Sequence, residues 1–330
     1  MHRTWLTAEE YGYRWEGGCS GMDNTPRGRT TPHAERQRPN NPDMLWIDAI
    51  CQQALSASII SDMYNLVNDG RTAAEWEERY NRKKDIVNKL YWNAEDGFYY
   101  DIDRNTHAQY KIMTTASYWA MTAGIASKEQ AQALADRVSD PDTMGGDVPL
   151  LSLSRSDNDF DQDGLYWRGS LWMPTAYASL CGLIKYGHYG VAHEAGLKIL
   201  KHMYSTYVNY EPHTIWECYS PTKCEPASNE HGDHIARPNF CGWSALGPIS
   251  IYIECVLGFH TVNGFDRVIE WEKPEGIKGE IGIKNLRFGG ITTDVVANGS
   301  LCTVVSDAPY TLVICGKRYD VTSGTNTFCI

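Results

Sequence analysis

The chain has 330 residues, of which 42% are hydrophobic and 12% aromatic, so it can bury a substantial core in one large domain or two. Its formal net charge of -11 argues against nucleic acids and anionic membranes as partners, because both need clustered Lys and Arg. No apolar run has the length of a membrane span, and the first five residues lack the apolar core of a signal peptide. We therefore expect a globular protein that is cytoplasmic or, if N-terminal residues are missing, periplasmic or secreted; its oligomeric state stays open.

The ten cysteines are scattered, with no C-x-x-C pair and no Cys/His spacing of a zinc site. Buried free thiols are therefore expected, and no cofactor is implied. Cys51 and Cys181 fall inside apolar helical patterns, which favours a reducing compartment or a fold that does not use disulfides.

Residues 1 to about 42 are predicted to be irregular around a loop at residues 16–27 that holds one carboxylate, Asp23. Glycines let this loop approach a ligand closely, while Trp15 and Arg27 on either side offer an aromatic face and a planar fork of donors. The alternative is an Asx-turn, in which Asp23 or Asn24 only hydrogen-bonds its own backbone. Catalysis would need a second carboxylate.

Residues 43 to about 67 have apolar residues at three-to-four spacing behind Asp43, which predicts a helix capped by that residue. Asp48 falls on its apolar face, where a solvent-edge position or a packing hydrogen bond is the ordinary explanation. Further helices are predicted at about residues 73–92, 113–122, 128–138, 171–186 and 189–207 and in the apolar run ending near 257, with a turn and a short extended run at 93–101. Helices that recur at similar spacing indicate stacked helical hairpins.

A long irregular stretch at residues 139–164 contains Asp159, Asp161 and Asp163, which copy the first half of a calcium loop. The twelfth position of that loop is Ser170 instead of a bidentate Glu, so a helix-loop-helix calcium site fails. A non-standard calcium site remains an alternative to a solvated acidic turn, which is the simpler interpretation.

The second carboxylate is Glu217, which lies between Trp216 and Tyr219 and shortly before a proline, a setting that predicts a rim rather than a core position. Two carboxylates flanked by aromatic residues suit the cleavage of a glycosidic bond, in which one acid protonates the leaving oxygen and one base activates water. His231 and His234 follow in a Gly-containing loop, where a segment that closes over substrate is favoured over a metal site.

Residues 264–330 alternate Val, Ile, Leu and Thr with turns that contain Gly and Asp, which predicts a small β-sandwich. This tail holds no convincing catalytic constellation, so we expect an accessory domain for packing or spacing. Residues 1–260 would form the catalytic domain.

Four segments of the chain occur in the order seen in six-hairpin glycosidases, namely Ser20-Gly21-Met22-Asp23-Asn24-Thr25-Pro26-Arg27, Tyr166-Trp167-Arg168-Gly169-Ser170-Leu171-Trp172, Trp216-Glu217-Cys218-Tyr219 and Phe240-Cys241-Gly242-Trp243-Ser244. On these segments the chain resembles glycoside hydrolase family 63 and the related mannosylglycerate hydrolases, and more distantly the trehalases. The resemblance covers roughly residues 12–258 and implies a mainly α fold, an (α/α)6 toroid, followed by the β-sandwich. A full toroid needs twelve helices, whereas about seven are predicted, all after the Asp23 loop, so a partial or N-terminally incomplete toroid is expected.

The resemblance implies hydrolysis of an α-linked glucoside or mannoside with inversion, with Asp23 as general acid, Glu217 as general base and an oligosaccharide or small glycoside as substrate. It also implies a set of sugar-binding residues, which are Trp15, Asn24, Arg27, Asp48, Tyr166, Trp167, Arg168, Gly169, Trp172, Trp216, Tyr219, His231 and Trp243. Two alternatives stay open. One is a carbohydrate-binding or scaffold remnant of such an enzyme without turnover; the other is a polysaccharide lyase, which an anionic chain without a basic cleft fits poorly.

Overall fold

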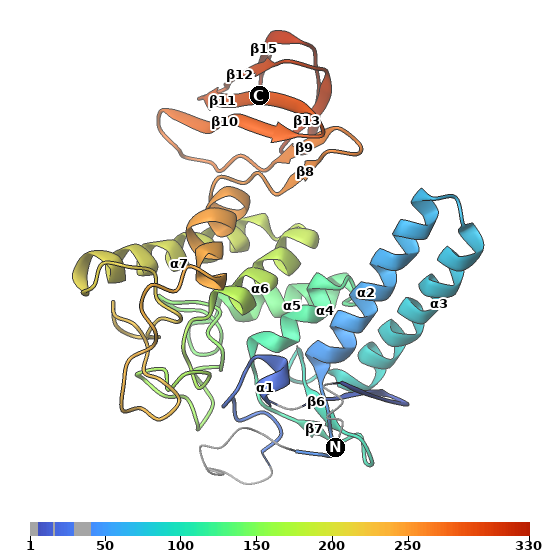
Figure 1. The fold of residues 1–330 in the computed structure, drawn as a ribbon, viewed down its shortest axis with the longest axis vertical. Coiled ribbons are helices and arrows are strands. Elements are labelled where there is room, and N and C mark those ends of the chain that lie inside the picture. Colours follow the sequence, from blue (N-terminus) through green and yellow to red (C-terminus); the bar gives the residue numbers. More distant parts are fainter. Residues whose placement is uncertain (1–5, 16, 30–40) are drawn as a thin grey trace.

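The computed structural model describes residues 6–15, 17–29 and 41–330. Helices form one part of the molecule, and the C-terminal strands form a β-rich region at one end of it (Figure 1). The two largest hydrophobic cores lie one in each part. Within the described ranges, no helix combines the length and the apolar character that crossing a bilayer requires.

The first long helices, α2 (Ile47–Leu66) and α3 (Gly70–Ile86), pack side by side as a hairpin (Figure 1). The predicted start of α2 at Asp43 is wrong, because β3 (Met44–Leu45) pairs with strand β6 (Asp101–Asp103) just before the helix begins. The backbone N–H of Ile47 donates to a carboxylate oxygen of Asp101 at 2.9 Å. A backbone N–H in the first turn of α2 therefore finds its acceptor in a residue far along the chain, instead of in Asp43.

The remaining predicted helices follow in the expected order, with different local geometry at three places, one of which is the π-helical end of the predicted helix at 73–92. The predicted helix at 113–122 is a 3-10 turn, η2 (Thr115–Tyr118), followed by the short α4 (Trp119–Thr122). The apolar run near 257 is a π-helix, η4 (Gly247–Val256), preceded by the 3-10 turn η3 (Trp243–Leu246). The other elements of this part are β1 (Thr7–Glu9), β2 (Gly12–Arg14), α1 (Gly17–Ser20), the π-helical η1 (Val87–Tyr91), β4 (Trp92–Asn93), β5 (Phe98–Tyr99), β7 (Gln109–Tyr110), α5 (Lys128–Ser139), α6 (Met173–Lys185) and α7 (Tyr189–Asn209).

These helices pack on one another in succession: α2 contacts α3 and α4, α4 contacts α6, and α6 and η4 both contact α7. One core cluster runs through them and includes residues from Met22 to Cys255. Helix pairs arranged around one core agree with the toroid-like fold that the sequence predicted. The loops before α6 and after α7 lie at the end of these helices that points away from the β-rich region (Figure 1).

The β-rich region contains β8 (Thr261–Asn263), β9 (Val268–Trp271), β10 (Glu280–Phe288), β11 (Ile291–Asn298), β12 (Leu301–Ser306), β13 (Tyr310–Ile314), β14 (Lys317–Val321) and β15 (Gly324–Cys329). These strands form two four-stranded sheets, ordered β14-β13-β9-β8 and β10-β11-β12-β15. Ile269 and Leu312 of the first sheet share a core with Val295 and Val304 of the second, so the predicted sandwich is confirmed. Its strands begin at residue 261 instead of the predicted 264.

The sandwich is attached to the helices just after η4. The indole N–H of Trp271 donates to the carbonyl of Leu257 at 2.7 Å, and Phe259 stacks on the same indole with ring centroids 4.6 Å apart. These contacts tie the second core to the last helix of the first. The division into a catalytic and an accessory domain stays a prediction.

The ten cysteines are free thiols. The expectation that they are buried is wrong for four of them, which lie exposed: Cys224, Cys241, Cys315 and Cys329. All four stand in turns, loops or strand ends, outside the apolar helical patterns on which the expectation was based.

Candidate active site

A pocket of about 230 Å³ opens among the loops at the end of the helices distant from the sandwich. It is lined by residues from three distant segments of the chain, which are Asp23, Tyr166, Glu217, Asn229, Glu230, His231, Ile235, Ala236 and Arg237. Both carboxylates proposed for catalysis lie in this lining, together with Tyr166 and His231 from the predicted sugar-binding set. The pocket is therefore the candidate active site.

Glu217 lies on the inner wall of this pocket. It is 4% exposed, so the prediction that it sits at a solvent rim is wrong. The phenol of Tyr166 donates to one carboxylate oxygen at 3.1 Å, and Nε of Arg237 lies 3.9 Å from the other. The backbone around Glu217 is held as well, because Leu171 and Tyr219 exchange two backbone hydrogen bonds at 2.9 and 3.1 Å. A phenol and a guanidinium together complement a negative charge on this carboxylate.

Tyr166 links the two carboxylates electrostatically. Burial raises the pKa of Tyr166 above its ordinary value, and the negative charges of Glu217 and Asp23 raise it further. The phenol therefore stays protonated at neutral pH and acts as a hydrogen-bond donor.

Asn24, next to Asp23, is 1% exposed and contacts the segment at residues 165–168. Its side-chain amide donates to the carbonyl of Leu165 at 2.9 Å and accepts from the N–H of Trp167 at 2.8 Å. The predicted role of Asn24 in sugar binding does not fit this geometry, because both ends of the amide are used inside the protein. The alternative of a local Asx-turn at Asn24 fails for the same reason.

Arg27 and Asp48 form a buried ion cluster with Asp101. The guanidinium makes hydrogen bonds of 2.7 to 3.0 Å to both oxygens of Asp48 and both oxygens of Asp101, and it lies 4.5 Å over the ring of Trp46. Burial alone would lower the pKa of Arg27, but the charges and hydrogen bonds of Asp101 and Asp48 raise it. Arg27 and Asp48 were expected to face the sugar; instead they tie the acid loop to α2 and β6.

Most of the predicted aromatic sugar contacts belong to the core. Trp167 stacks on Trp172 with ring centroids 4.0 Å apart and planes at 7°, and both are buried, as are Trp216 and Tyr219. These four side chains are therefore placed as packing residues and not as an exposed sugar platform. Trp243 differs, because 42% of it is exposed.

The other predicted binding residues are also occupied within the fold. Trp15 packs against the small cluster around Trp46. The buried Arg168 donates through Nε to the carbonyl of Asn24 at 3.1 Å. Gly169 has φ +141°, and a Cβ there would lie 2.8 Å from the ring of Phe160, so glycine is required by close packing.

The three aspartates of the calcium-like loop do not converge on one point. Asp159 pairs with Arg29 and lies 3.7 Å from Arg168, while Asp163 pairs with Lys223 at 2.8 Å. Across residues 6–15, 17–29 and 41–330, no group of three His, Cys, Asp or Glu side chains is arranged to hold a metal ion. The calcium alternative is therefore not supported, since cationic side chains already neutralise two of these carboxylates.

Residues 1–234 match the model of the mannosylglycerate hydrolase MGH1-like glycoside hydrolase domain. The chain belongs to this family. Its membership in a family of glycoside hydrolases also removes the lyase alternative.

Curated relatives of this MGH1-like chain include the mannosyl-oligosaccharide glucosidase of Saccharomyces cerevisiae, 27% identical over 258 residues, and the cytosolic neutral trehalase of Kluyveromyces lactis, 27% identical over 202 residues. The matches cover 71% and 60% of this chain but 29% and 26% of the relatives, so the chain spans about a quarter to a third of these relatives.

Solved structures agree on the fold. The GH63 mannosylglycerate hydrolase from Thermus thermophilus in complex with glucose is 19% identical, with a TM-score of 0.51 over 64% of this chain and 45% of its own. A chain described as a sialidase is 14% identical, with a TM-score of 0.70 over 98% of this chain and 28% of its own. These likenesses support a helical toroid-like fold followed by a β-rich region.

Several residues of this pocket, above all Arg237, are not among those predicted from the sequence. The loop after Glu217 is predicted to close over substrate, but this residue is not named in that prediction. The available signal was an arginine beside Pro238 in a loop otherwise rich in acidic residues and histidine. Asp101 was missed as well, although a carboxylate directly after Tyr99 and Tyr100 is a sign of a buried partner.

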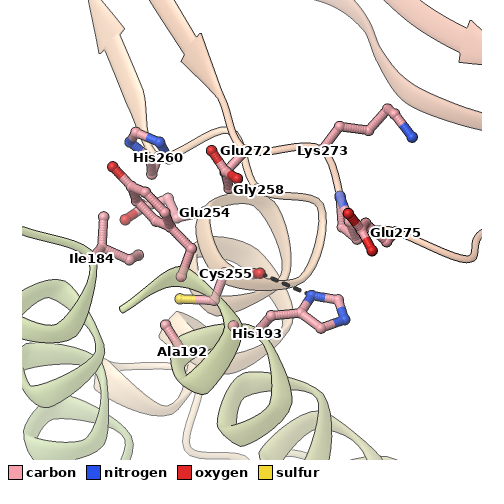
Figure 2. Close-up of a pocket in the computed structure, with 13 residues that line it drawn as sticks. Ile184, Ala192, His193, Glu254, Cys255, Gly258, His260, Glu272, Lys273 and Glu275 are labelled. Atoms are coloured by element: carbon pink, nitrogen blue, oxygen red, sulfur yellow. Dashed lines mark hydrogen bonds between the residues drawn. The ribbon is translucent and has the colours of Figure 1, made fainter. Parts of the chain in front are cut away.

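A second crevice of about 390 Å³ lies where the helices meet the sandwich (Figure 2). Figure 2 shows Glu272, Lys273 and Glu275 above it and His193 and Cys255 below, with Nδ1 of the imidazole hydrogen-bonded to the Cys255 carbonyl at 3.3 Å. This crevice is at the C-terminal end of α6 and the N-terminal end of α7, whereas the Glu217 pocket is at their opposite ends. The 13 residues of α6 alone span about 20 Å, so the crevice is separate from the candidate active site.

Proposed function

We propose that this MGH1-like chain carries the catalytic pair of a glycosidase that hydrolyses an α-linked glucoside or mannoside with inversion. The observation that carries the proposal is that Asp23 and Glu217, far apart in the sequence, line one pocket together with Tyr166, whose pKa both charges raise. The names of the relatives, a mannosyl-oligosaccharide glucosidase, a trehalase and a mannosylglycerate hydrolase, point to glucose or mannose as the sugar.

In the proposed mechanism, Glu217 is the carboxylate that takes a proton from water as the water oxygen attacks the anomeric carbon. Asp23, as a carboxylic acid, donates its proton to the departing glycosidic oxygen. Because bond formation and bond cleavage occur in one displacement, the anomeric configuration inverts. Tyr166 holds one oxygen of Glu217 by its hydrogen bond and so limits the directions in which the other can accept a proton.

The proposal is tested with nitrophenyl α-glucoside and α-mannoside and with the natural disaccharides, between pH 4 and 8. Asp23→Asn and Glu217→Gln keep the side-chain shape but remove the proton chemistry, so each should lower kcat by about 10²- to 10⁴-fold or more. Glu230→Gln is the matched control, because Glu230 lines the same pocket without an assigned role and its loss should leave most of the turnover. NMR of the first product formed should show the inverted anomer.

Two outcomes would contradict the proposal. Wild-type turnover in Asp23→Asn or Glu217→Gln would remove the assigned pair. Saccharide binding without hydrolysis at any pH in this range would favour the carbohydrate-binding alternative. That alternative is tested because the chain spans only part of the length of its relatives.

A further inference from the structure

The backbone at residues 165–167 adopts a conformation that must be held by its surroundings. Leu165 has φ +31° and Tyr166 has φ +65°, so two consecutive residues with side chains lie in the left-handed region. This region is disfavoured for residues that carry a Cβ, and it persists only where neighbouring contacts fix it.

The contacts that fix this backbone come from three side chains and one backbone carbonyl. Ser228 accepts from the N–H of Leu165 through its hydroxyl at 2.9 Å and from the N–H of Tyr166 through its carbonyl at 3.0 Å. The indole of Trp172 donates to the carbonyl of Tyr166 at 3.0 Å. Two further groups, the carbonyl of Leu165 and the N–H of Trp167, are both bound by the amide of Asn24.

Asn24 therefore binds the backbone on both sides of Tyr166, at Leu165 and at Trp167. The side-chain amide of Asn24 presents one donor and one acceptor, as a peptide group would. In addition, Nε of Arg168 donates a hydrogen bond to the backbone carbonyl of Asn24. Because Asn24 is covalently next to Asp23, the same clamp also fixes the backbone that carries the proposed acid. Tyr166 in turn donates to Glu217, the proposed base.

We propose that Asn24 is a positioning residue that sets the placement of Asp23 and, through the backbone and phenol of Tyr166, of Glu217. This inference rests on the proposed function for its kinetic consequence. Asn24 is buried and both ends of its amide are occupied, so it acts on the reaction without touching substrate. The clamp therefore couples the placement of the acid to that of the base through one side chain.

The test compares Asn24→Ala with Asn88→Ala. Asn88 is a matched control, because its amide also bridges two segments, donating to the Ile125 carbonyl at 3.0 Å and accepting from the Tyr99 hydroxyl at 2.8 Å, without a contact to the pocket. Both variants should unfold at lower temperature than wild type. Asn24→Ala should also lower kcat by about 10²-fold with little change in KM, since a displacement of about 1 Å has effects of that size; Asn88→Ala should keep kcat near that of wild type.

Asn24→Asp supplies a pH signature. A neutral carboxyl can reproduce both clamp bonds, whereas an ionised one has no donor for the Leu165 carbonyl. The ratio of its kcat to that of wild type should therefore fall as the pH rises, which a general loss of stability in Asn88→Ala would not reproduce. Equal kcat in Asn24→Ala and Asn88→Ala, or a ratio for Asn24→Asp independent of pH, would overturn the proposal.

Crystal structures of wild type and Asn24→Ala decide the matter independently of turnover. Loss of the left-handed conformation at Tyr166 and of its bond to Glu217 is expected; an unchanged pocket would overturn the proposal. If Asp23→Asn retains wild-type turnover, the proposed function fails, whereas full loss in Asp23→Asn combined with wild-type kcat in Asn24→Ala rejects the positioning role alone.

Discussion

Replacing Arg27 by Met tests whether the buried ion cluster is the main anchor of the acid loop. The guanidinium stands between Asp48 and Asp101, whose side chains are 2% and 4% exposed, and all four carboxylate oxygens accept from it. Removing one partner of a buried ion pair costs about 3–5 kcal/mol because the other charge is left unpaired. Here one change strands two carboxylates, so the expected loss in free energy of unfolding is at least about 4 kcal/mol at neutral pH.

The assay is urea denaturation at neutral pH, followed by circular dichroism. Arg27→Lys keeps the charge but has no planar fork to reach both partners, and an intermediate loss is expected. It also gives a measurable variant if Arg27→Met does not fold.

Arg71→Met is the control for a surface pair. Arg71 is 92% exposed and lies 3.7 Å from Glu75, and such pairs contribute about 0–1 kcal/mol. If Arg27→Met loses no more free energy of unfolding than Arg71→Met at neutral pH, the cluster is not an anchor and the reasoning is refuted.

Three further predictions follow from other parts of the molecule. Burial lowers the pKa of His202 below its ordinary value, so the stabilisation by the neutral imidazole is complete above about pH 6.5 and is lost as the pH falls. The decline in free energy of unfolding towards acid pH should therefore be shallower in His202→Leu than in wild type, and an unchanged slope would contradict this. Trp243→Ala should raise KM more than it lowers kcat if this exposed indole binds the sugar, while an unchanged KM would assign it to the surface. A fragment of residues 257–330 should unfold cooperatively, as followed by the fluorescence of its buried Trp271, and a fragment without a transition would show that the sandwich depends on the helices.

The periodicity of the sequence was sufficient to place α5, α6 and α7 within two residues of their observed ends, because each is a regular amphipathic or apolar run between clear breakers. It failed at the start of α2, where the capping carboxylate, Asp101, comes from a distant strand. A long-range cap leaves no local pattern, since the helical spacing continues backwards through Met44 and Leu45 even though these residues pair as a strand.

The candidate site was predictable to the level of segments but not of side-chain directions. At both motifs, adjacent side chains have different surroundings. Tyr166 and Glu217 line the pocket, whereas Trp167 and Trp216 beside them are buried in the core. Motif similarity therefore overestimated the number of sugar contacts, because it counted the core-facing neighbours with the pocket-facing ones.

The way in which the Asp23 loop is held has a chemical consequence for the proposed mechanism. A general acid and a general base act only if their carboxyls keep a fixed separation, and a loop carrying Asp23 has no regular secondary structure to provide it. The loop is instead fixed at two buried points, the Asn24 clamp to residues 165–167 and the Arg27 cluster with α2 and β6. Asp23 lines the pocket and directly precedes the first of these anchored positions in the sequence, so Asn24 and Arg27, which were first expected to hold the sugar, instead hold the loop that carries the proposed acid.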